Sequence, residues 1–203
     1  MYNSHSGPCA MGVDVGDTKH VIIGTKSGDD QYTLVKMAQF SGLEAWDRIH
    51  DLARRFNVKS AVIDIRPDTD IVRQFQKQEP YKIFLCEYSD NPAYTRTWDT
   101  LKKIVKDYRT ALFDETHRMV VEPGMLTIPR SSHPEVKEFA KQMCNAYKLL
   151  ETNKRTGAKA YRYKGKKEHY RNALNYFMLA ASKSRVARRG RQKQRQTATN
   201  NKG

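Results

Sequence analysis

Two aspartates stand among apolar residues in short runs that favour β-strands. Asp14 lies in MGVDVGD, and Asp64 lies in AVIDIRPDTD. A carboxylate buried without a partner is costly, so its place in a buried strand needs an explanation. If the strands are neighbours, the two carboxylates repel each other unless a cation lies between them, and ligand sets made only of oxygen favour Mg²⁺ or Mn²⁺. We therefore predict that both strands deliver a carboxylate to one divalent-metal site.

A third ligand is expected from the helix predicted over KKEHYRNALNYFMLAASK. Glu168 and Asn172 share one face of that helix, and His169 lies about 100° away around its axis. Acidic groups in a first turn are favoured by the positive end of the helix. Which of Glu168, His169 and Asn172 completes the site stays open, and the softer nitrogen of His169 suits Mn²⁺ better than Mg²⁺. Taken singly, each aspartate could instead cap a strand end, and His169 could be a packing histidine.

The elements that must position these residues indicate an α/β domain. An amphipathic helix, with Ser41 as its cap, follows three strand-like runs. A strand, a helix and a strand come next, an order that favours parallel pairing. The expected strands cover residues 10–17, 19–27, 31–40, 60–66 and 81–89, and the helices cover 42–57 and 69–78.

The second half of the chain is predicted less regularly. Residues 93–130 alternate polar and apolar side chains, which predicts extended strands with a projecting hairpin around Glu122-Pro123-Gly124. A helix with Pro134 in its first turn is expected over 132–150, and a short basic strand over 158–165. Three parts are thus predicted: a disordered linker or cloning remnant at 1–9, a domain at 10–182, and a disordered tail at 183–203 with eight basic residues and no acidic one.

The charge of the chain restricts its partners. Its 37 Lys and Arg residues outnumber 22 Asp and Glu, and the net charge of +15 favours a polyanion, either nucleic acid or an anionic membrane surface. No run approaches the roughly 20 apolar residues of a membrane span, and no signal sequence opens the chain, so we expect a soluble intracellular protein. Three separated cysteines argue against a disulfide framework or a cysteine zinc site. The absence of a G-x-x-x-x-G-K-[ST] motif argues against an ATP-driven motor.

Four segments carry a resemblance to a known family. They are GVDVGDTKHVII, AVIDIRPDTDIVRQFQKQEPYKIFLCEY, KDYRTALFDETHRMVVEPGMLTIP and EHYRNALNYFMLA. Together they resemble the C-terminal nuclease domain of tailed-bacteriophage large terminase subunits. The resemblance implies an RNase H-like fold, with a central mixed β-sheet flanked by helices. It also implies a metal-dependent endonuclease that cuts concatemeric double-stranded DNA during genome packaging, with little sequence specificity.

The resemblance extends to single positions. Asp14 resembles the aspartate of the family's first strand and Asp64 that of the second. The last helix usually carries Asp-His, where this chain has Glu168-His169, and a later acidic position is Asn172. The implied chemistry uses two ions, Mg²⁺ or Mn²⁺ with Mn²⁺ favoured, held by Asp14, Asp64, Glu168 and His169.

The resemblance also implies partners and a location. These are the terminase ATPase domain, and possibly the small terminase and portal proteins, in the cytoplasm of a phage-infected bacterium, with the isolated domain monomeric. The expected phosphate contacts are basic residues near the site, namely Lys102, Lys103, Lys106, Arg109, Lys159, Arg162, Lys164, Lys166 and Lys167. A junction resolvase or transposase-type nuclease of the same fold, or a catalytically silent nucleic-acid-binding module, remain alternatives.

Overall fold

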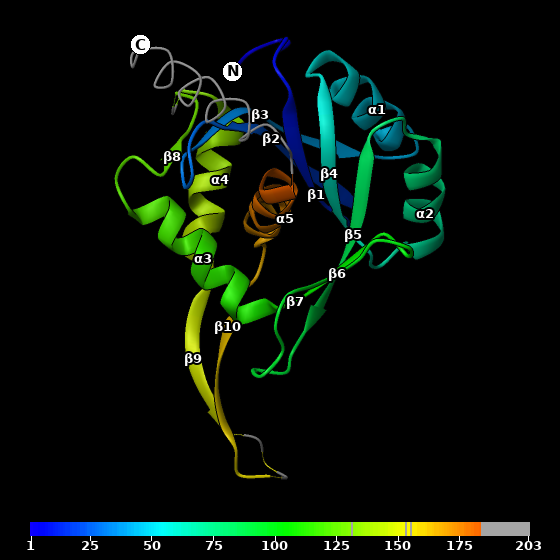
Figure 1. Ribbon diagram of the computed structural model, residues 1–203. Helices are drawn as coiled ribbons and strands as arrows, with labels where there is room; N and C mark the ends of the chain where they lie inside the picture. The colour runs from blue at the N-terminus through cyan, green and yellow to red at the C-terminus, as the bar shows by residue number, and fades with distance from the viewer. Residues whose placement is uncertain (131, 153, 155, 184–203) are drawn as a thin grey trace, which may run out of the picture.

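The computed structural model describes residues 1–130, 132–152, 154 and 156–183, and its centre is an eight-stranded mixed sheet (Figure 1). The strand order is β6-β7-β5-β4-β1-β2-β3-β8. β1, β4, β5 and β7 run parallel to one another, and β2 is antiparallel to both β1 and β3. The strands are β1 Cys9–Asp14, β2 Thr18–Lys26, β3 Tyr32–Ser41, β4 Val58–Asp64, β5 Lys82–Ser89, β6 Thr97–Asp99, β7 Ile104–Tyr108 and β8 Leu126–Thr127.

Helices cover both faces of this sheet and bury one apolar cluster on each (Figure 1). One cluster joins the sheet to α1 and α2, and the other joins it to α3, α4 and α5. The helices are α1 Ala45–Arg55, α2 Thr69–Gln78, α3 Arg109–Val121, α4 Pro134–Asn145 and α5 His169–Lys183. The predicted α/β class, with a central mixed sheet flanked by helices, is confirmed. Within the described residues no helix has the length and apolar character needed to cross a bilayer.

Helix α5 lies directly against β1, and Gly12 makes this contact possible. A Cβ atom at Gly12 would stand 2.1 Å from both the Ala173 carbonyl oxygen and the Phe177 backbone nitrogen. No side chain fits at that distance, so the helix backbone rests on the strand backbone. The first residue of α5 is thereby held close to the end of β1, where Asp14 is found.

Residues 93–130 form only short strands, β6, β7 and β8, and the hairpin predicted around Glu122-Pro123-Gly124 is wrong. The run RTALFDETHRMVV forms α3, and Glu122-Pro123-Gly124 is the turn after it. The buried positions of α3 include two threonines, while Val120 and Val121 are exposed. Its amphipathic pattern is therefore weak, and packing against α5 decides its structure.

A projecting hairpin does exist, but from a later part of the chain. The helix predicted over 132–150 ends at Asn145, and the next residues form β9, Tyr147–Thr152, which pairs antiparallel with β10, Lys159–Lys164 (Figure 1). The basic strand predicted at 158–165 is thus one arm of this hairpin. The predicted cap was also wrong, because Ser41 is the last residue of β3 and Glu44 precedes α1.

The structure describes all of the predicted N-terminal segment, but only the first residue of the predicted C-terminal tail. Residues 1–8 form no helix or strand, but the Met37 backbone N–H donates to the Met1 sulfur at 3.2 Å, and the amino terminus contacts His133. Lys183, the first residue of the predicted tail, ends α5. The rest of that tail, 184–203, lies outside the described residues.

Candidate metal centre

Asp14 and Asp64 end two neighbouring parallel strands. Val13 of β1 is in register with Ile63 of β4, so the aspartates occupy the next position of each strand. Adjacent strands lie about 4.8 Å apart, and side chains at equivalent positions point to the same face. That face is the one covered by α5. The structure thus brings these two predicted site residues together, from segments fifty residues apart in the sequence.

The first turns of α5 supply polar partners to both carboxylates. His169 Nδ1 lies 2.9 Å from Asp14 Oδ2, and the Asn172 side chain also hydrogen-bonds Asp14. The Tyr176 hydroxyl donates to Asp64 Oδ2 at 2.9 Å, and the Arg66 backbone N–H donates to Asp64 Oδ1 at 3.1 Å. One helix face therefore orients both acids, and Asn172 acts as an amide donor where another acid would be repelled.

Glu168 is placed differently from the other predicted ligands. One of its carboxylate oxygens is ion-paired with the Arg109 guanidinium, and the other, Oε2, is buried without a hydrogen-bond partner among the described residues. Arg109 also donates to the Tyr163 carbonyl at 2.9 Å and lies over the Phe113 ring. A buried carboxylate oxygen with no donor is costly, and a cation could satisfy it.

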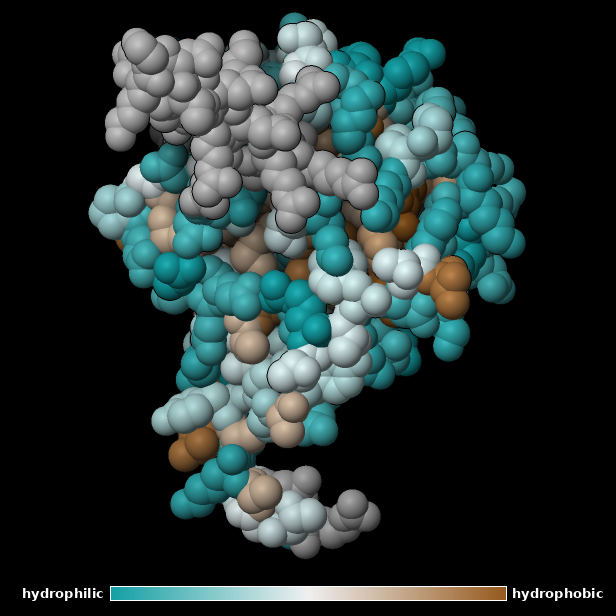
Figure 2. All heavy atoms as spheres, viewed as in Figure 1, coloured by the Kyte–Doolittle hydropathy of each residue, from teal (hydrophilic) through white to brown (hydrophobic). Residues whose placement is uncertain are grey.

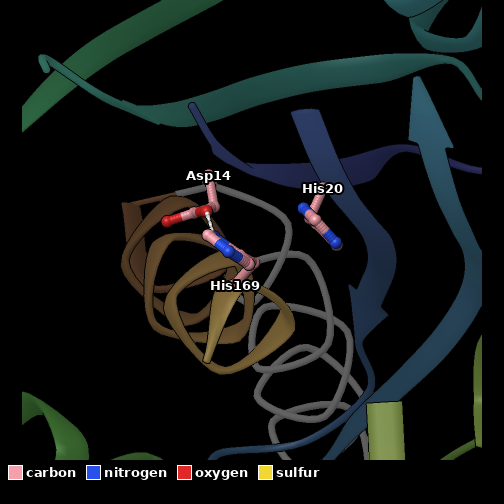
Figure 3. A group of neighbouring side chains, drawn as sticks. All are labelled: Asp14, His20 and His169. Carbon is pink, nitrogen blue, oxygen red and sulfur yellow. Dashed lines mark hydrogen bonds and ion pairs between the residues drawn. The ribbon is translucent and has the colours of Figure 1, made fainter. Parts of the chain in front are cut away.

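His20 lies beside Asp14 and His169, although it was not among the ligands predicted from the sequence. It lies opposite Asp14 in the antiparallel pairing of β1 and β2, and only 5% of it is exposed. Figure 3 shows Asp14, His20 and His169 facing one another, with ligand atoms that all lie within 4.8 Å of one another. The sequence contained a signal for this position. Asp14 and His20 are each three residues from Asp17, and in a hairpin that turns at Asp17 such residues lie opposite each other.

Burial dominates the electrostatics of the site. Desolvation raises the pKa of Asp14, against the hydrogen bond from His169, and it raises the pKa of Asp64 to about 6, with the Asp14 charge adding to the effect. Desolvation lowers the pKa of His20 to about 4, while the hydrogen bond to Asp14 raises the pKa of His169. The two carboxylates therefore lack sufficient positive charge around them, which is the condition that favours cation binding.

We expect Asp64→Asn to stabilise the metal-free protein at neutral pH. The folded-state pKa of Asp64, about 6, exceeds the ordinary 3.8, so ionisation costs stability that is lost as pH rises from about 4 through 6. Removing the charge should recover roughly 1–3 kcal/mol above pH 7 and nothing below pH 4. Urea unfolding of both proteins in chelator, at pH 4 and pH 7.5, measures this difference.

Asp107 offers the matched control for this substitution. It is a buried carboxylate, whereas Asp64 is half-buried, and the Arg96 guanidinium donates to it at 2.6 Å. Asp107→Asn should therefore destabilise the protein, because it removes the buried half of the ion pairing of Arg96 and leaves that arginine only the more exposed Glu115. Destabilisation by Asp64→Asn at pH 7.5 would contradict the view that Asp64 lies in a site built for a cation.

The nine basic residues predicted to contact phosphate fall into two groups, those that form ion pairs within the protein and those that do not. Arg109 is bound internally to Glu168, and Arg162 and Lys164 both pair with Glu151. Lys102 and Lys106 pair with Asp99 and Glu87. Four are exposed and show no ion pair within the described residues: Lys103, Lys159, Lys166 and Lys167.

Several of these residues lie on the hairpin or just after it. Figure 2 shows this hairpin as a narrow extension of the molecule that carries hydrophilic and hydrophobic residues side by side. Its exposed apolar side chains are Tyr147, Leu149, Leu150 and Tyr161. Lys166 and Lys167 follow β10 and directly precede Glu168, so positive charge reaches the edge of the site.

Comparisons with known proteins did not identify a relative of this chain. A scan against protein-family models and searches among curated proteins and solved structures found no match. A function for this chain is therefore inferred from the geometry and chemistry of the site itself.

Proposed function

We propose that this chain is a divalent-metal-dependent endonuclease with an RNase H-like fold, similar to the nuclease domain of phage terminases. The observation that carries the proposal is the pair Asp14 and Asp64, side by side at the ends of parallel strands beneath the start of α5. The order β3-β2-β1-β4-β5, in which β2 runs opposite to the other four strands, supports the RNase H-like assignment.

The residues present fit a site for Mg²⁺ or Mn²⁺. Asp14 and Asp64 offer carboxylates, one buried and one half-buried, whose pKa values desolvation raises. Glu168 Oε2 is buried without a hydrogen-bond partner among the described residues. Bound ions would activate a water and stabilise the leaving oxygen of a phosphodiester. In this proposal Asp14 and Asp64 hold the ions, Glu168 or His169 completes the set, and Tyr176 and Asn172 keep the carboxylates oriented.

Double-stranded DNA is the substrate that the charge distribution favours. The exposed lysines leading into α5 and the basic hairpin lie on the side of the molecule where α5 begins (Figure 1). Contacts to phosphate carry no sequence information, so cleavage should be largely independent of sequence, and affinity should fall steeply with salt. A packaging role, with an ATPase domain, small terminase and portal as partners in a bacterial host, belongs to the same proposal.

Incubation of the full chain with supercoiled plasmid tests the proposal. Nicking in Mn²⁺ or Mg²⁺, and none in chelator, supports a nuclease. Preferential cutting of four-way junctions over linear duplex would favour a resolvase instead. Strong gel shifts without cutting in any metal would favour a catalytically silent binding module. The specific observation behind this last alternative is the ion pair of Arg109 with Glu168. In the family that the chain resembles, the position of Asn172 is usually acidic.

We expect Mn²⁺ to support cleavage better than Mg²⁺. Histidine nitrogen is a softer ligand than a carboxylate oxygen, and His169 lies beside Asp14. Initial rates of plasmid nicking at equal free concentrations of the two ions measure the preference, and His169→Gln should reduce it. Equal rates in the two metals would count against a histidine ligand.

A further inference from the structure

We infer that Asp14, His20 and His169 form a transition-metal site that binds Zn²⁺, distinct in its ligands from the two-carboxylate pair of Asp14 and Asp64. The ligand atoms of the three side chains lie within 4.8 Å of one another (Figure 3). One carboxylate and two imidazoles are a ligand set that suits Zn²⁺ and its neighbours in the periodic table, whereas Mg²⁺ prefers oxygen. Asp14 is common to both sites, and so is His169 where it completes the nuclease set. His20 belongs to this site alone, and Asp64 lies outside it.

His20 is held in the tautomer that a metal requires. Its Nδ1 lies 3.1 Å from the Thr18 carbonyl oxygen, which can only accept, so Nδ1 carries the hydrogen and Nε2 keeps its lone pair. A second ring nitrogen bonded to a backbone carbonyl is the usual support of a metal-binding histidine. Only 5% of His20 is exposed, so its neighbours restrict the ring and fix the direction of the Nε2 lone pair.

His169 is the ligand that can move, and it lies on the side of the site that is open to solvent. Its side chain is 44% exposed, whereas that of Asp14 is 4% exposed. Its ring is stacked on that of His20, with centroids 4.8 Å apart and an angle of 13° between the planes. An ion lies in the plane of an imidazole that binds it, so His169 must turn out of the stack to complete the set.

Besides this turn of the ring, the ligand atoms need to move only a short distance. Zn²⁺ with bonds of about 2.1 Å holds tetrahedral ligands about 3.4 Å apart, so the ligand atoms approach by little more than an ångström. Three protein ligands and one side open to solvent is the arrangement of zinc sites that keep a position for water or another ligand. Affinity should follow the general order of divalent ions, with Zn²⁺ above Co²⁺ and Co²⁺ above Mn²⁺.

Metal binding by the full chain, without DNA, tests this inference. Zn²⁺ affinity is measured by competition with a chromophoric chelator in excess Mg²⁺, and the visible spectrum of the Co²⁺ form reports nitrogen ligands. His20→Gln and His169→Gln should each weaken Zn²⁺ binding at least about tenfold. His117→Gln, an exposed histidine of α3, is the matched control and should bind as the parent does. Asp64→Asn should also change Zn²⁺ binding little.

The outcomes are separable from those of the nuclease proposal. Zn²⁺ binding that depends on His20 in a chain that never cuts DNA would keep this inference and remove the nuclease. Cleavage in Mg²⁺ or Mn²⁺ by a chain with no Zn²⁺ site would do the reverse. Circular dichroism in chelator shows which variants fold. If His20→Gln does not fold, Zn²⁺ binding by His169→Gln provides the test, because His169 is half-exposed and its replacement should not disturb the core. Unchanged Zn²⁺ affinity in a folded His20→Gln or His169→Gln protein overturns the inference.

Discussion

Plasmid cleavage should fall by at least about a thousandfold when Asp64 is replaced by asparagine, a loss of about 4 kcal/mol of transition-state stabilisation. The substitution keeps the shape of the side chain and its contact with the Tyr176 hydroxyl, but it removes the charge that would hold an ion. Because the same substitution should stabilise the metal-free fold, the loss of activity cannot come from unfolding. Nicking rates in saturating Mn²⁺, beside unfolding curves of the same samples, measure both effects.

Asp17 provides the matched control for this experiment. It is an exposed aspartate in the turn after β1, three residues from Asp14. Asp17→Asn changes net charge by the same amount as Asp64→Asn, so the two variants should differ only through the site. We expect Asp17→Asn to cut at nearly the parental rate. Cleavage by Asp64→Asn at a rate close to that of Asp17→Asn would remove the two-carboxylate site from the proposal.

Gly12→Ala should disrupt the fold itself. Its added Cβ would meet two backbone atoms of α5 at 2.1 Å, and backbone cannot move aside as a flexible side chain can. Overpacking of a core usually costs 1–3 kcal/mol, and a backbone contact this short should cost more than about 3 kcal/mol or prevent folding. Urea unfolding followed by circular dichroism measures the change, and the soluble yield on expression gives a second reading.

The neighbouring Gly16 separates this steric effect from the general cost of replacing glycine. A Cβ at Gly16 would find its nearest atom, the Thr18 carbonyl oxygen, at an ordinary 3.7 Å. The free energy of unfolding of Gly16→Ala should therefore lie within about 1 kcal/mol of that of the parent protein. If Gly12→Ala had the same midpoint as Gly16→Ala, α5 could not lie on β1 as described, and the placement of His169 beside Asp14 would fail with it.

The sequence by itself determined the framework of the site. Apolar runs identified the strands that carry Asp14 and Asp64, and the helix predicted over 69–78 has the bounds of α2. The strand–helix–strand order predicted the parallel pairing of β4 with β5. These features are local, because hydrophobic periodicity within one segment, and short connections between segments, are enough to specify them. The helix that carries His169 was predictable for the same reason.

Only the tertiary structure decided which side chains meet. Residues 109–121 form a helix because α5 accepts their buried face, which their own weak periodicity did not indicate. Strand register places His20 opposite Asp14, and packing of the hairpin base brings Arg109 to Glu168. Such contacts join residues distant in sequence, and their energy depends on burial and on neighbouring charges that no single segment contains. The choice of partner for each carboxylate therefore belongs to the folded molecule.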